Sequence, residues 1–202
     1  MIGLHEPVSG EILIDGVDIV SASEDSLHSV LRKFGVSYQS GALLGSMTVR
    51  DNVRLVLEEF THLPREAMDL IARMKLQLVG LAEAGGKMPS ELSGGMIKRA
   101  AIARALALDP QIVFLDEPSA GLDPVTAAGL DELILRLCRS LHLTFVLVTH
   151  ELASIFAVAD EAILLSKETR GIVARGSPTE LRRSRDPRVS RFFHRQAAAT
   201  ME

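Results

Sequence analysis

The feature that most constrains the fold is an unbroken apolar run, Ile112 to Leu115, which leads directly into Asp116 and Glu117. A strand that is apolar at every position must be covered on both faces, as the strands of parallel sheets are. The segments around it alternate between strand-like and helix-like patterns, and parallel strands need such helical crossovers. The chain is therefore predicted to be an α/β protein with this strand inside a mostly parallel sheet flanked by helices.

Periodicity, helix caps and turn residues predict the other elements. Asp15 and Gly16 separate two short apolar segments, which indicates a hairpin. Apolar residues at helical spacing alternate with further strand-like runs along the rest of the chain. The predicted strands are 11–16, 17–20, 34–39, 111–118 and 144–150, with a hairpin at 161–176; the predicted helices are 23–33, 93–108, 124–141, 151–159, 177–184 and 186–195.

The 202 residues are predicted to form a single domain, 1–202, with two distinctive parts. Residues 48–88 have a helical pattern, with Pro64 at the start of the second helix, and are predicted to be a helical subdomain. Residues 177–202 are a basic C-terminal extension, which could be solvated or could contact anionic lipid or a neighbouring subunit. Its arginines are Arg182, Arg183, Arg185, Arg188, Arg191 and Arg195.

Composition limits the classes of function. A net charge of -4 argues against a nucleic-acid-binding protein, which would normally present a basic face. No apolar run approaches the roughly 18 residues needed to cross a bilayer, and no signal-peptide pattern follows Met1. We therefore expect a cytoplasmic chain that reaches a membrane only through a partner or a surface.

Two short segments have the residue types of a phosphate or metal site. Asp116 and Glu117 follow the apolar strand at the end where open α/β sheets bind ligands, so Asp116 could hold Mg²⁺ and Glu117 could activate a water molecule. Ser93, Gly94 and Gly95 begin an alanine-rich helix, where exposed N–H groups attract anions. An acidic turn after a strand and a capped glycine turn would give the same patterns without any function.

Further polar residues occur at compatible spacing. Gln39 ends a predicted strand, the segment Ser119 to Asp123 follows Glu117, and His150 ends another strand. If the strands before Glu117 and His150 are neighbours, the imidazole lies beside the acidic pair. Five such elements in one order make coincidence a poor explanation.

Taken in order, these segments resemble the ATP-binding subunit of an ABC transporter. SYQ resembles the Q-loop, LSGGM the signature, QIVFLDE the Walker B strand, SAGLD the D-loop and TH the switch histidine. The resemblance extends from about Ser9 to Gly176. It implies a P-loop NTPase-like core, transport-coupled ATP hydrolysis, and ATP and Mg²⁺ as cofactors.

The resemblance also implies a homodimer of ATPase subunits, in which each nucleotide lies between two chains. Glu117 would polarise the attacking water and His150 would contact the γ-phosphate. Asp116 would hold Mg²⁺, and Gln39 would sense both the metal and the water. The residues implied to bind the nucleotide of the partner chain are Ser93, Gly94, Gly95 and Asp123.

A finer resemblance is to ATPases of the Mla or Mce type. It is based on YQSGALLGSMTVRDNV, MPSELSGGMIKRAAIARALALDP and DPRVSRFF, and on Met96 in the signature. It implies phospholipid transport between bacterial membranes, an integral-membrane permease docked on the helical segment, and a lipid-binding Mce-type protein as a further partner. The subunit would then be peripheral on the cytoplasmic side of the inner membrane, and its C-terminal extension would contact the neighbouring subunit.

The phosphate-binding motif of this family, GxxxxGK[ST], does not occur in the 202 residues. Ile2-Gly3-Leu4 resemble the tail of the helix that follows this motif. The strand that feeds the motif is expected beside strand 111–118, so two apolar strand edges are predicted to be unpaired there. We therefore expect these residues alone to fold poorly and to bind ATP weakly or not at all.

Three hypotheses remain open at this stage. The first is a lipid-transport ATPase whose start codon was placed late or whose gene is truncated, which an in-frame GxxxxGK[ST] upstream would support. The second is a non-catalytic binding protein that keeps the signature and the docking surface. The third, a non-transport ABC protein of DNA repair or translation, ranks last because the sequence contains no coiled coil, zinc module or second cassette.

Overall fold

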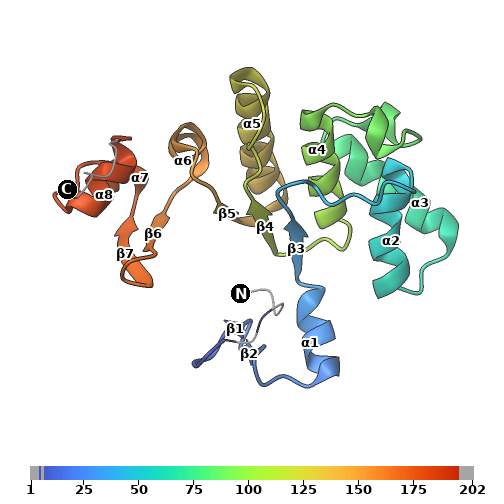
Figure 1. Cartoon of the computed structure of the whole chain (residues 1–202). Helices are drawn as coiled ribbons and strands as arrows, with labels where there is room; N and C mark the ends of the chain where they lie inside the picture. Colours follow the sequence, from blue (N-terminus) through green and yellow to red (C-terminus); the bar gives the residue numbers. More distant parts are fainter. Residues whose placement is uncertain (1–4, 6, 196–202) are drawn as a thin grey trace.

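The computed structural model describes residue 5 and residues 7–195; the predicted helix tail at Ile2-Gly3-Leu4 lies outside the described residues. Figure 1 shows a row of helices beside a small central sheet, with a separate hairpin toward each end of the chain. None of the described helices is long and apolar enough to cross a membrane. The elements are β1 (Leu13–Ile14), β2 (Val17–Asp18), α1 (Glu24–Leu31), β3 (Phe34–Ser37), α2 (Val49–Phe60), α3 (Arg65–Leu78), η1 (Ala82–Ala84), η2 (Pro89–Glu91), α4 (Gly94–Ala105), β4 (Ile112–Asp116), α5 (Pro124–Leu141), β5 (Thr144–Val148), α6 (Leu152–Val158), β6 (Ala162–Ser166), β7 (Gly171–Gly176), α7 (Pro178–Arg182) and α8 (Pro187–Phe193).

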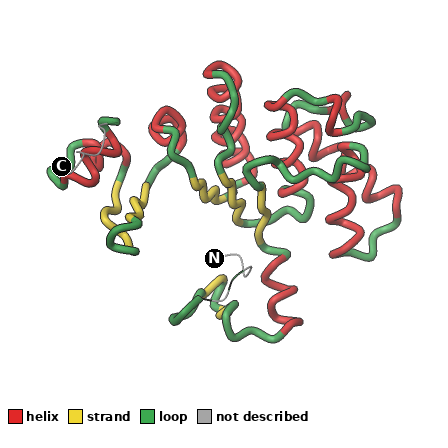
Figure 2. The backbone as a smooth tube through the Cα atoms, viewed as in Figure 1, coloured by secondary structure: helices red, strands yellow, loops and turns green. Residues whose placement is uncertain are grey.

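The central sheet is parallel and has the strand order β3-β4-β5. β4 pairs with β3 at Phe34↔Ile112 and with β5 at Leu115↔Leu147. The expectation of an unpaired edge beside β4 is therefore wrong, because β4 is hydrogen-bonded along both of its edges. Among the described residues, the edges without a strand partner are the outer edges of β3 and β5 (Figure 2).

The two faces of β4 are covered to different degrees. Val113 and Leu115, 0% and 1% exposed, face the helices, as predicted for a buried strand. Ile112 and Phe114 lie on the other face and are half-buried, with Phe114 packed edge-to-face on Phe34. The prediction that both faces are covered is therefore confirmed for only one face of the described structure.

The helices pack side by side in the order α3, α4, α5, α6 and α7 (Figure 1). Helix α4 lies directly against β3 because Gly35 has no side chain: a Cβ at this position would be 2.0 Å from the carbonyl oxygen of Ala105. This contact places α4, which begins at the signature segment, against the sheet edge that leads to Gln39.

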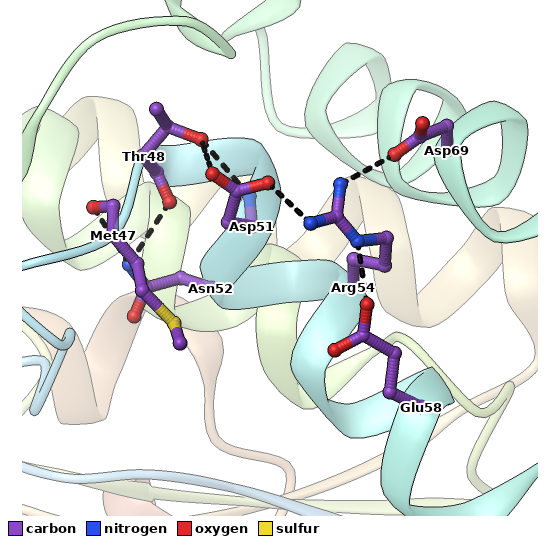
Figure 3. A network of polar contacts seen from close by, with 7 residues as sticks. All are labelled: Met47, Thr48, Asp51, Asn52, Arg54, Glu58 and Asp69. Atoms are coloured by element: carbon purple, nitrogen blue, oxygen red, sulfur yellow. Dashed lines mark hydrogen bonds and ion pairs between the residues drawn. The ribbon is translucent and has the colours of Figure 1, made fainter. Parts of the chain in front are cut away.

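Helices α2 and α3 are joined by a network of ion pairs around Arg54 (Figure 3). The Arg54 side chain is 10% exposed and pairs with Asp51 at 2.7 Å, Glu58 at 2.8 Å and Asp69 of α3 at 2.7 Å. Next to it, the buried amide of Asn52 bonds main-chain groups of the preceding loop. These helices occupy the segment predicted as a subdomain, and its independence stays a prediction.

The hairpins β1-β2 and β6-β7 are antiparallel, as predicted. The second hairpin leads into α7 and α8, whose Val189 and Phe193 are buried with Ile155 of α6. In contrast, Leu165 and Ile172 on the hairpin are 70% and 64% exposed. The described part of the C-terminal extension, residues 177–195, therefore packs on α6, while apolar side chains of the hairpin face solvent.

Candidate functional site

Glu117 follows β4 directly and has an unusual backbone conformation. Its φ is +45°, in the left-handed region that non-glycine residues rarely adopt. Its N–H donates to the carbonyl of Val148 at 2.8 Å, and its own carbonyl accepts from Nζ of Lys98 at 2.9 Å. The turn after β4 is therefore held both to the end of β5 and to helix α4.

The Glu117 carboxylate contacts two side chains from the turn after β5. Its Oε1 lies 2.6 Å from Nδ1 of His150, and its Oε2 accepts a hydrogen bond from Oγ1 of Thr149 at 3.2 Å. The Glu117 side chain is 17% exposed, whereas that of His150 is 68% exposed. The prediction that His150 lies beside the acidic pair is confirmed.

The contact favours the protonated form of His150. Its pKa is raised mainly by the hydrogen bond to Glu117 and then by the negative charge of the same carboxylate, with a smaller contribution from Glu151. A protonated imidazole donates from both ring nitrogens. With Nδ1 occupied by Glu117, the exposed Nε2 is the atom that can donate to an anion outside the protein.

The loop after β3 is held next to the turn at Glu117 by hydrogen bonds to its main chain. The carbonyl of Gln39 accepts a hydrogen bond from Lys98, whose ammonium also binds the carbonyl of Glu117. The carbonyl of Gly41 accepts from Nη2 of Arg104 at 2.9 Å, which ties the loop to α4 a second time. The Gln39 side chain itself is exposed, so it is available to a ligand or a metal ion.

The signature residues form a separate surface at the first turn of α4. Ser93 caps this helix, and its side chain accepts from the N–H of Met96 at 3.3 Å. Gly95 is buried against α5, where a Cβ would lie 2.6 Å from Cγ2 of Thr126, and Asp123 caps α5. Two helix N-termini therefore meet here. The N-terminus of α5 is capped by the Asp123 carboxylate, which accepts from the N–H groups of Val125 and Thr126 at 3.1 Å, whereas that of α4, capped by a neutral serine, can attract an anion.

The predicted site residues thus fall into two groups. Glu117, His150 and the main chain of Gln39 meet at the carboxyl ends of the strands. The second group forms the signature surface and consists of Ser93, Gly94, Gly95 and Asp123. No hydrogen bond or ion pair among the described residues joins the first group to the second.

Sequence reasoning missed two residues of the first group, Lys98 and Thr149. For Lys98 a signal was present, because it shares a helix face with Ala101, Ile102 and Ala105, and a charge on an apolar face is unusual. Thr149 gives no such signal, since its role depends on which strand lies beside β5.

The described residues contain no group of three or more His, Cys, Asp or Glu side chains that could hold a metal ion. Asp116 is exposed at the end of β4. Mg²⁺ usually binds through one or two carboxylates together with phosphate oxygens and water. A single carboxylate at this position therefore fits a Mg²⁺ ion that arrives with a phosphate ligand.

The chain matches the family model described as ABC transporter over residues 1–120. It is 42% identical over 187 residues to "Intermembrane phospholipid transport system ATP-binding protein MlaF" of Haemophilus influenzae, which covers 93% of this chain and 70% of that relative. It is also 42% identical over 194 residues to "Probable ribonucleotide transport ATP-binding protein mkl" of Mycobacterium leprae, covering 96% of this chain and 55% of that relative.

A solved structure is similar over most of the fold. It is the dimeric ATP-binding cassette MJ0796 in a post-hydrolysis state with ADP and Pi, at a TM-score of 0.77 and 28% sequence identity. The alignment covers 88% of this chain and 77% of that chain. The predicted α/β fold with flanking helices is confirmed by this similarity.

Proposed function

The chain belongs to the ABC transporter family, and we propose that it is an ATP-binding subunit whose ATP hydrolysis drives phospholipid transport between bacterial membranes. One relative is named for phospholipid transport and another for ribonucleotide transport, at the same identity of 42%. This chain covers 70% of the first but 55% of the second. The larger share of the relative that the match covers therefore favours the phospholipid substrate.

Hydrolysis would depend on the orientation of the Glu117 carboxylate. Phosphoryl transfer needs mainly positioning and charge stabilisation from the protein. Thr149 and His150 each engage one oxygen of Glu117, so the carboxylate is oriented while further lone pairs remain free to accept a proton from water. Protonated His150 would donate from Nε2 to a phosphate oxygen.

The residues present fit part of a site for ATP and Mg²⁺. When bound, Mg²⁺-ATP supplies the phosphoryl group that is transferred to water. The signature surface leaves no room for a side chain at Gly95 and presents helix N-termini, which suits a γ-phosphate held by a second copy. Asp116 and Gln39 would serve the metal. Because GxxxxGK[ST] is not among the 202 residues, we expect these residues alone to bind ATP weakly.

The proposed assembly is a homodimer on a membrane permease. Leu70 and Met74 of α3, both 55% exposed, are one helical turn apart and form an apolar surface on which a permease would dock. A lipid-binding Mce-type protein would be a further partner, and the subunit would be peripheral on the cytoplasmic side of the inner membrane. Exposed Arg182 and Arg183 of the extension would contact the neighbouring subunit.

The single observation that carries the proposed hydrolysis is the contact between Glu117 and His150 at 2.6 Å. In the complete transporter, Glu117→Gln keeps the shape of the side chain but removes the proton acceptor. We expect ATP turnover to fall at least about a hundredfold, as for loss of a general base. Glu132→Gln, at an exposed position of α5, is the matched control and should leave turnover unchanged.

The same preparation distinguishes the remaining alternatives. Transfer of a labelled phospholipid between vesicles, lost in Glu117→Gln, would support the proposed substrate; transport of ribonucleotides instead would contradict it. No ATP turnover by the unaltered transporter would favour the non-catalytic binding protein.

A further inference from the structure

Lys98 is a buried cation with an unusual set of partners. The residue is 8% exposed, and its ammonium donates to the main-chain carbonyls of Gln39 and Glu117. None of the ion pairs formed by the described residues includes it. Burial lowers its pKa, although the charges of Glu117 and Asp116 oppose this. Burying an ammonium without a bonded carboxylate is unfavourable, so the arrangement calls for a reason other than stability.

The two carbonyls belong to two of the residues predicted to act on the nucleotide. Glu117 has a positive φ, so the direction of its side chain depends on a main chain that must be held in place. Its carbonyl accepts from Lys98 at 2.9 Å and, at the longer distance of 3.2 Å, from the N–H of Ala120, while the bond to Val148 at 2.8 Å holds its N–H. The same ammonium holds the start of the loop that carries the Gln39 side chain.

Lys98 also lies on the helix that begins with the signature. Gly95 and Lys98 are separated by one turn of α4, and Gly95 is fixed against Thr126 of α5. A movement of the signature turn would therefore move the ammonium, and with it both carbonyls. In the proposed dimer the signature serves one nucleotide and Glu117 the other, so this helix connects the two sites.

We propose that Lys98 is a positioning residue, which holds the main chain of Glu117 and Gln39 in the geometry for hydrolysis and couples it to the signature turn of the same helix. The inference depends on the proposed ATP hydrolysis and adds to it a residue that does not touch the nucleotide.

The test compares two buried lysines in the complete transporter. Lys98→Met removes the ammonium from the site, whereas Lys75→Met removes an equally buried ammonium, 7% exposed, that pairs with Asp109 away from it. We expect Lys98→Met to lower kcat about tenfold to a hundredfold with KM within about twofold, because misplacement of a catalytic group has effects of this size. Lys98→Arg, which keeps the charge and donors, should retain most of kcat, and Lys75→Met all of it.

A second measurement does not depend on hydrolysis. Amide hydrogen exchange of residues 38–42 and 116–119 in the nucleotide-free protein should become faster in Lys98→Met and stay unchanged in Lys75→Met. If Lys98→Met does not fold, Lys98→Gln is judged by the same criteria, because its neutral amide is one bond shorter than the ammonium and cannot bind both carbonyls.

The inference would be overturned by a kcat of Lys98→Met within twofold of the unaltered protein, by unchanged exchange in both segments, or by an equal loss of kcat in Lys75→Met. Failure of the proposed function gives a different result, since Glu117→Gln would then keep its ATP turnover.

Discussion

Arg54 and Lys98 are both buried cations, but their surroundings differ in kind. Arg54 pairs with three carboxylates, so its charge is more than balanced, and the pair with Asp69 joins α2 to α3 (Figure 3). Lys98 bonds two carbonyls and no carboxylate. The first arrangement holds two helices together, while the second holds the main chain of residues that would act on a nucleotide. A buried cation thus contributes mainly to stability or to function according to the groups that receive its hydrogen bonds.

The largest expected effect is the loss of stability when Arg54 is replaced. Arg54→Met leaves three neighbouring carboxylates without their cation, and we expect the free energy of unfolding to fall by about 2 to 3 kcal/mol. The value is below that for a fully buried pair because the carboxylate side chains are 28% to 41% exposed. Urea denaturation of the complete subunit measures it. Glu58→Gln leaves Arg54 with two carboxylate partners and should lower the free energy of unfolding by about 0.3 kcal/mol.

A smaller loss of stability is expected when Lys98 is replaced. Lys98→Met leaves the Gln39 carbonyl without its donor, while the Glu117 carbonyl still accepts from the N–H of Ala120 at 3.2 Å. The substitution also removes an unpaired charge from the interior, so we expect a loss of about 1 kcal/mol in the free energy of unfolding. Urea denaturation beside the kinetic measurements would show whether stability and turnover respond separately. If Lys98→Met lost more stability than Arg54→Met, the distinction between a stabilising Arg54 and a functional Lys98 would be wrong.

The smallest effect concerns the pair formed by Glu117 and the exposed His150. In Glu117→Gln the pKa of His150 should fall toward its ordinary value near 6.5, because the raising hydrogen bond and charge are removed. The stabilisation from this contact is fully present below the ordinary pKa and is lost as pH rises through the raised pKa. Proton NMR titration of His150 measures the shift. An unchanged pKa would mean that the pair is not formed in solution.

Much of this molecule could be predicted from local sequence patterns. The apolar run before Asp116 predicted a buried strand, and the ends of the runs placed Glu117 and His150 correctly beside each other. The partners of β4 were wrongly predicted, because strand order depends on crossover connections and not on the strand's own residues. Lys98 was missed for a similar reason, since the Gln39 carbonyl that it binds lies 59 residues away in the chain.

The positive φ of Glu117 sets stability and activity against each other at one position. Glycine would adopt this conformation freely, whereas a residue with a side chain is strained by about 1 kcal/mol or more. Selection for a robust fold alone would place glycine at the end of β4. The carboxylate is kept there in spite of its conformational strain, so a consensus or stability-driven redesign of this chain should leave this residue untouched.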